Sequence, residues 1–177
     1  MSRLDSKKVV HLNTTNAVCP IGEATGKKNM RESKVPVLSC EGACIRGEIA
    51  RLAASIVSKE ESFARGCHGE LITVPDSSIA RWVKNAEMVV LIDGCFLRCH
   101  GRIIENIIDR HRLIQFDALS HYNRYTDIFD IDDVPEDERK VVAHSVADWI
   151  IDSLKKHSTK TPALYKRADN RRTGCCG

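Results

Sequence analysis

The apolar residues of this chain fall into short runs of strand length. Residues 35–38, 88–92 and 112–116 form such runs, and residues 62–67 are a fourth candidate. The run at 88–92 is apolar at every position, which is typical of a strand that is covered on both faces. The pattern therefore predicts about four strands.

Between and after these runs, apolar residues recur at helical spacing. The spacing predicts helices over residues 45–58, after the Pro-Asp-Ser-Ser start at 75–78, over 98–110, and over 135–158. The last of these begins with a proline and three acidic residues, as helix starts often do. In contrast, residues 19–26 contain a proline and two glycines and are predicted to form a loop.

Alternation of strands and helices is the pattern of an α/β protein. We predict a single domain over residues 1–158: a three-layer αβα sandwich with an open, mostly parallel sheet of about four strands and helices on both faces. Right-handed crossovers place the carboxyl ends of all parallel strands at one edge, where such sheets bind their ligands.

Composition and charge bear on where this domain is expected to work in the cell. Charged residues make up 29% of the chain and hydrophobic residues 42%, and no apolar run is long enough to span a membrane. The polar first eight residues do not form a secretory signal, so we expect a cytoplasmic protein. We expect no membrane partner, and a protein partner or a homo-oligomer stays open.

The end of the chain differs in charge from the rest. Residues 155–177 carry a net charge of +6, whereas residues 1–154 carry −3. We interpret residues 159–177 as a basic, flexible tail. No aromatic platform or nucleic-acid motif accompanies the charge, so nucleic acid is not the expected partner. A module that binds an acidic partner or a nucleic acid through this tail is the third hypothesis for function.

The cysteines carry the candidate chemistry. The chain has eight, and in a reducing compartment metal binding or thiol chemistry is favoured over a disulfide framework. Cys40 and Cys44 follow the first predicted strand, and Cys95 and Cys99 follow the central one, each pair spaced Cys-x-x-x-Cys. Cys67 follows the candidate strand at 62–67. Parallel topology would bring these thiols to one edge of the sheet.

Four thiolates form the usual closed, tetrahedral ligand set of Zn(II). We therefore predict a zinc site made by Cys40, Cys44, Cys95 and Cys99. Cys67 is either a fifth thiol, acting as a resting nucleophile or an exchangeable ligand, or a packed side chain. A surplus of thiolates would suit an iron–sulfur cluster equally well. The second hypothesis is accordingly a thiol or iron–sulfur enzyme acting on sulfur or selenium species or on electrons.

Three residues beside these cysteines have roles of their own. Asp93 stands at a strand end and is predicted to cap the following helix, and Gly94 to allow a tight turn. His100 is interpreted as a surface residue of that helix. No phosphate loop, dinucleotide fingerprint or nucleophile elbow is present in the sequence.

At these positions the chain resembles the DGC-domain family of zinc-binding proteins. The family is named for the tripeptide found here as Asp93-Gly94-Cys95, and the resemblance extends to the Cys-x-Gly-x-Cys motif at residues 39–44. It covers about residues 35–118. The resemblance implies an α/β fold and cysteine-ligated zinc, and it implies no particular reaction. Carried over residue by residue, it indicates Cys40, Cys44, Cys95 and Cys99, with Cys67 as a further candidate.

Overall fold

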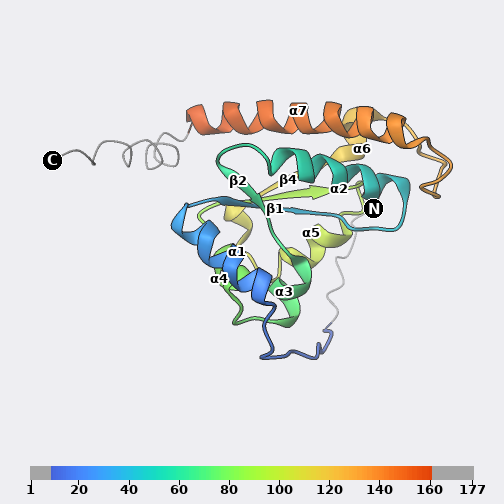
Figure 1. Ribbon diagram of the computed structural model, residues 1–177. Helices are drawn as coiled ribbons and strands as arrows, with labels where there is room; N and C mark the ends of the chain where they lie inside the picture. Colours follow the sequence, from blue (N-terminus) through green and yellow to red (C-terminus); the bar gives the residue numbers. More distant parts are fainter. Residues whose placement is uncertain (1–8, 161–177) are drawn as a thin grey trace, which may run out of the picture.

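The computed structural model describes residues 9–160 and contains one parallel sheet (Figure 1). The four strands lie in the order β2-β1-β3-β4, and each neighbouring pair is parallel. Their bounds are β1 Val35–Ser39, β2 Phe63–Arg65, β3 Val89–Asp93 and β4 Leu113–Asp117. The predicted α/β fold and its four strands are confirmed, and the described sheet is entirely parallel.

Helices lie on both sides of this sheet, as predicted. In Figure 1, α2 and α7 lie above it, and α1, α3 and α4 lie below it. The helices of the described residues are α1 Pro20–Arg31, α2 Ile45–Val57, α3 His68–Thr73, α4 Ser78–Asn85, α5 Cys99–Ile104, α6 Ala118–Tyr122 and α7 Glu136–Lys160, with a 3-10 turn η1 at Arg110–Arg112. The tail predicted at 159–177 lies outside the described residues from position 161 onward.

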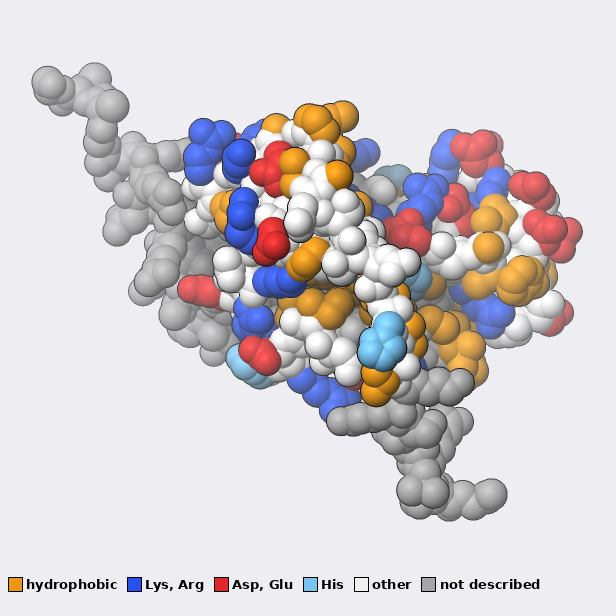
Figure 2. All heavy atoms as spheres, turned by 90° about the horizontal axis from the view of Figure 1, so that it is seen from below, with side chains coloured by type: hydrophobic (Ala, Val, Ile, Leu, Met, Phe, Trp, Pro, Cys, Tyr) orange, Lys and Arg blue, Asp and Glu red, His pale blue; other side chains and the backbone are white. Residues whose placement is uncertain are grey.

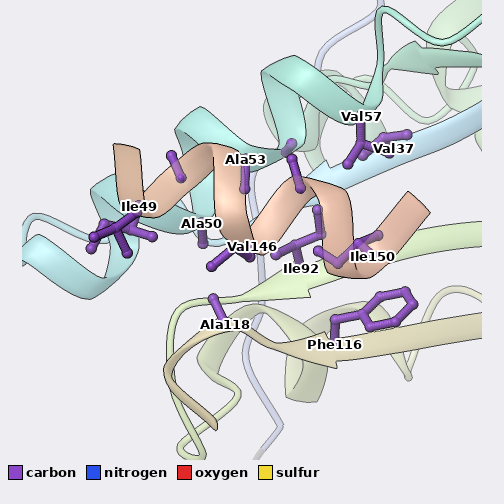
Figure 3. Close-up of a cluster of buried hydrophobic side chains, with 14 of the residues drawn as sticks. Val37, Ile49, Ala50, Ala53, Val57, Ile92, Phe116, Ala118, Val146 and Ile150 are labelled. Carbon is purple, nitrogen blue, oxygen red and sulfur yellow. The ribbon is translucent and has the colours of Figure 1, made fainter. Parts of the chain in front are cut away.

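The position of β3 in the sheet explains why its sequence up to Ile92 is apolar at every position rather than alternating. Val90 and Ile92 belong to the core under α2 and α7, whereas Val89 and Leu91 belong to the core on the opposite face. All four are fully buried. Figure 3 shows side chains from α2 and α7 converging on Ile92. The central strand is therefore shared by two hydrophobic cores, one on each side of the sheet.

The loop predicted at residues 19–26 is wrong, because these residues begin α1. Pro20 is the first helical residue, a position where proline's missing N–H costs nothing. Gly26 is present for close packing, since a Cβ added there would overlap the backbone of Ser78 at the start of α4. Gly26, which in the sequence indicated a loop, therefore allows close contact between two helices.

The long helix predicted over residues 98–110 is also wrong in extent. Helix α5 ends at Ile104, and the chain then tightens, with the N–H of Ile107 donating to the carbonyl of Ile104 three residues back. Ile104 and Ile108 are nevertheless both buried in the lower core. Ile107 packs partly buried against the same core, whereas Ile103, predicted on the same face, is 48% exposed. The apolar face was therefore predicted correctly only in part, and a turn rather than a continuous helix carries Ile108 into the core.

Glu23 links α1 to α4 on the lower face of the molecule. Figure 2 shows that basic and acidic side chains are interspersed over this face. The carboxylate of Glu23 accepts hydrogen bonds from the backbone N–H of Ser78 (2.6 Å) and from its hydroxyl (2.8 Å). The N–H bond from Ser78, then the hydroxyl, then Lys27 hold the pKa of Glu23 below its usual value.

Glu23→Gln is expected to lower the melting temperature at neutral pH. A carboxyl whose folded pKa is depressed contributes stability above its unfolded pKa of about 4.5, and that contribution is lost as pH falls through the folded pKa. The difference in melting temperature between wild type and variant should therefore become smaller at acidic pH. Thermal unfolding from pH 7 to pH 3 measures it, with the exposed Glu60→Gln as control. A gap independent of pH would contradict the assignment.

Candidate functional site

The first cysteine pair connects β1 to α2. The N–H of Cys40 donates to the carbonyl of Ile92 (2.8 Å), which extends the β1–β3 ladder by one step. The Cys40 sulfur accepts a hydrogen bond from the N–H of Gly42 (3.4 Å). Cys44 is the N-cap of α2, and both thiols are half-buried. This pair therefore lies where the sequence placed it, at a strand end and at the following helix start.

The second pair connects β3 to α5. Cys95 is the second residue after β3 and is half-buried, whereas Cys99 is the first residue of α5 and is exposed. Between them Arg98 adopts a left-handed backbone conformation (φ 51°), and its N–H donates to the carbonyl of Cys95 (3.0 Å). The turn is thus tight, and both thiols stay near the carboxyl end of β3.

Glycine contacts hold the two pairs side by side. A Cβ added to Gly94 would lie 2.8 Å from the backbone carbonyl of Arg46, in the first turn of α2. A Cβ added to Gly47 would lie 2.5 Å from the carbonyl oxygen of Gly42. Both cysteine-bearing turns therefore pack backbone against backbone on the start of α2, an approach that only glycine permits. The contacts bring the backbones of the two turns together, and the convergence of their thiols stays a prediction.

Three of the thiols interact electrostatically. Burial raises the pKa of the Cys95 thiol, and the nearby thiols of Cys44 and Cys99 add to this rise. The backbone N–H of Leu97 and the guanidinium of Arg46 act in the opposite direction. The raised pKa means that Cys95 holds its proton at neutral pH until a stronger partner for the sulfur displaces it.

The third cysteine turn is tied to the same edge by Arg65, the last residue of β2. Its guanidinium donates to a carboxylate oxygen of Glu41 (2.6 Å), to the hydroxyl of Ser39 (3.0 Å) and to the carbonyl of Val37 (3.2 Å). These bonds join the end of β2 to the loop that carries the first pair. Cys67 follows two residues later as the exposed N-cap of α3. The third turn therefore lies beside the first.

Asp93 fixes the start of α5, as its predicted capping role requires. The residue is 1% exposed, and one carboxylate oxygen, Oδ1, accepts a hydrogen bond from the N–H of Gly101 (3.2 Å). Burial raises the pKa of Asp93, and the bond from Gly101 partly offsets that rise. Within the described residues its other oxygen, Oδ2, has no hydrogen-bond partner.

A pair of histidines at this edge escaped the sequence interpretation. The rings of His68 and His100 lie edge to face, with centroids 4.9 Å apart and planes at 67°. His100 is half-buried, so its assignment to the helix surface is wrong. Burial, and after it the charge of His100, lower the pKa of His68 to about 4. The available signal was a repeated tripeptide, Cys-His-Gly, at residues 67–69 and 99–101.

The thiols share an edge without forming a closed ligand set. Among the side chains that the structure describes, in residues 9–156, no three of His, Cys, Asp or Glu are gathered in an arrangement that could hold a metal ion. The donor chemistry does suit one, because thiolates are preferred ligands of zinc and of iron–sulfur clusters. The described cysteines all carry free thiols: Cys19, Cys40, Cys44, Cys67, Cys95 and Cys99.

These features define an α/β protein with several thiols at the carboxyl edge of a parallel sheet. A family model described as the DGC domain matches residues 36–142, so the chain belongs to the DGC-domain family. This membership supports a metal-binding role in general terms. Comparisons with curated proteins and with solved structures found no match. None of the helices within residues 9–160 has the length and apolar character needed to cross a membrane.

Proposed function

We propose that the chain binds Zn(II) through the thiolates of Cys40, Cys44, Cys95 and Cys99. The observation that carries the proposal is the packing of the Gly94 turn on the first turn of α2, because it sets the second cysteine pair beside the first. Membership of the DGC-domain family supports the same role. Zinc bound by four thiolates is a closed site, which suits handling or sensing of the metal in the cytoplasm.

Two positive features would stabilise a bound zinc–thiolate cluster, although burial raises the pKa of Cys95. Four thiolates and one dication carry a formal charge near −2. Arg46 opposes the rise in the pKa of Cys95, and the amino-terminal end of α2, where Cys44 is the N-cap, carries a partial positive charge. Both would stabilise the negative cluster and help a metal displace the thiol protons.

Zinc binding would require the four sulfurs to converge, because the described side chains hold no ready set of three or more ligands. The Cys40 sulfur would give up its bond from the N–H of Gly42, and the exposed Cys99 side chain would turn toward Cys95. Cys67, exposed and beside the first pair, would serve as an exchangeable fifth thiol.

Protein purified without oxygen is expected to contain about one zinc per chain, as a four-thiolate site requires. Cys95→Ser and Cys99→Ser should each remove most of it, whereas Cys19→Ser, at the start of α1, should not. Elemental analysis measures the content. Substoichiometric zinc that is unchanged in the Cys95 and Cys99 variants would rule the site out. Iron accompanied by inorganic sulfide would favour the iron–sulfur hypothesis instead.

The other two hypotheses stay predictions. The thiol hypothesis takes Cys67 or Cys95 as the nucleophile, and of these Cys67 is exposed whereas Cys95 is half-buried. Recognition through the basic tail concerns residues 159–177, of which 161–177 lie outside the described part of the chain.

A further inference from the structure

The histidine pair between α3 and α5 has two nitrogen atoms without partners. His68 Nε2 and His100 Nδ1 are each shielded from solvent, and neither has a hydrogen-bond partner among the described residues. Buried polar atoms nearly always have a partner in folded proteins. Two such atoms on rings that touch each other indicate that something polar binds between or beside them.

The spacing of the two rings fits a shared metal ion. When two imidazoles bind one tetrahedral ion of the zinc class at about 2.0 Å, their ring centroids lie about 5 Å apart. The observed separation is 4.9 Å, and the planes are strongly inclined rather than stacked. A neutral imidazole nitrogen is the commonest protein ligand for such ions. The ring spacing is compatible with two ligands of one ion, and ordinary edge-to-face packing of rings has a similar spacing.

Charge at the pair also favours a cation. The carboxylate of Glu41 interacts electrostatically with His68, and that of Asp93 with His100. The two arginines nearby are already paired with acids, Arg65 with Glu41 and Arg98 with Glu105. Asp93 in addition has a buried oxygen without a partner among the described residues.

We propose that His68 and His100 together bind a divalent cation of the zinc class through His68 Nε2 and His100 Nδ1. This second site goes beyond the four-cysteine site, which uses neither histidine. Among the side chains that the structure describes, no third donor is gathered with the two nitrogens, so other ligands would have to complete the coordination. Cys67 and Cys99 immediately precede the two histidines. A site beside two exposed thiols is suited to holding an ion on its way to or from them.

The test uses the full chain with ¹⁵N-labelled histidine, purified without oxygen and titrated with Zn(II) alone. The expected result is that the ring nitrogens of His68 and His100 shift together and saturate, while those of the exposed His111 stay unchanged. The double variant His68→Ala, His100→Ala should lose this additional equivalent of zinc, and His111→Ala should retain it. Because the wild-type spectrum is decisive alone, a variant that fails to fold does not weaken the test.

Two outcomes would overturn the inference. The first is saturation of the thiolate absorption by a metal probe such as Co(II) with no change at either histidine. The second is a parallel shift of all histidines, which would indicate surface binding only. The two sites can also fail separately. Cys95→Ser should remove thiolate-bound zinc and leave the histidine shifts in place, so loss of one signal does not imply loss of the other.

Discussion

Gly94→Ala is expected to destabilise the protein by about 1–3 kcal/mol, as overpacking of a close contact does, and to abolish the proposed binding of zinc. The added Cβ would lie 2.8 Å from the carbonyl carbon and oxygen of Arg46 and 2.9 Å from the backbone nitrogen of Gly47. All three are backbone atoms of a helical turn, so no side chain can rotate away to relieve the overlap. Either the Asp-Gly-Cys turn or the start of α2 must move, and each movement separates the two cysteine pairs.

Gly69→Ala is the matched control. A Cβ at Gly69 would meet only the Cys67 sulfur, at 3.8 Å, which is ordinary van der Waals contact. Neither glycine has a positive φ, so alanine can adopt the backbone at both positions. The control should stay within about 0.5 kcal/mol of wild type and retain its zinc. Denaturant unfolding and elemental analysis measure both quantities. If Gly94→Ala kept full zinc and full stability, the close packing would not be what assembles the site.

The central strand and its burial on both faces could be predicted, because almost the whole sequence of β3 is apolar. A run such as residues 88–92 has few alternatives to a strand with a core on each face. Helix α1 gave no such signal, since its glycines serve contacts far along the chain: Gly26 packs on Ser78 of α4 and Gly22 on Glu70 of α3. The helix predicted over residues 98–110 was too long, because apolar spacing indicates which residues are buried and not which backbone carries them. A turn after Ile104 buries Ile108 equally well.

The candidate site likewise has a part that the sequence predicts and a part set by contacts between distant segments. Parallel topology alone placed the cysteines at one edge, so their neighbourhood could be predicted from the sequence. The packing of the two cysteine-bearing turns could not be predicted, because it depends on Gly47 and Gly94 contacting the backbone of other segments. The histidine pair joins residues that are far apart in sequence, and only the repeated Cys-His-Gly tripeptide hinted at it. Sulfur positions depend on side-chain rotation, which no sequence pattern specifies.

Ile92→Ala is expected to lower the free energy of unfolding by about 2–5 kcal/mol, the usual range for a large buried aliphatic side chain. Ile92 is fully buried and pairs with Ser39 of β1 and Phe116 of β4. Figure 3 shows its side chain within the core formed with α2 and α7. Truncation leaves a cavity there, on a strand hydrogen-bonded on both sides that has little freedom to collapse. Ile103→Ala, at a position 48% exposed, is the control and should change stability far less.

The same variant separates the stability of the sheet from the assembly of the site. Ile92 lies two residues before Gly94, yet alanine at position 92 keeps the backbone bond from the N–H of Cys40 to the carbonyl of Ile92. The glycine contacts on α2 are also untouched. Below its melting temperature, Ile92→Ala should therefore bind as much zinc as wild type, although Gly94→Ala should not. Loss of zinc from folded Ile92→Ala protein would show that the cysteine turns depend on the packing of the core, and the glycine contacts alone would then not explain how the site is held together.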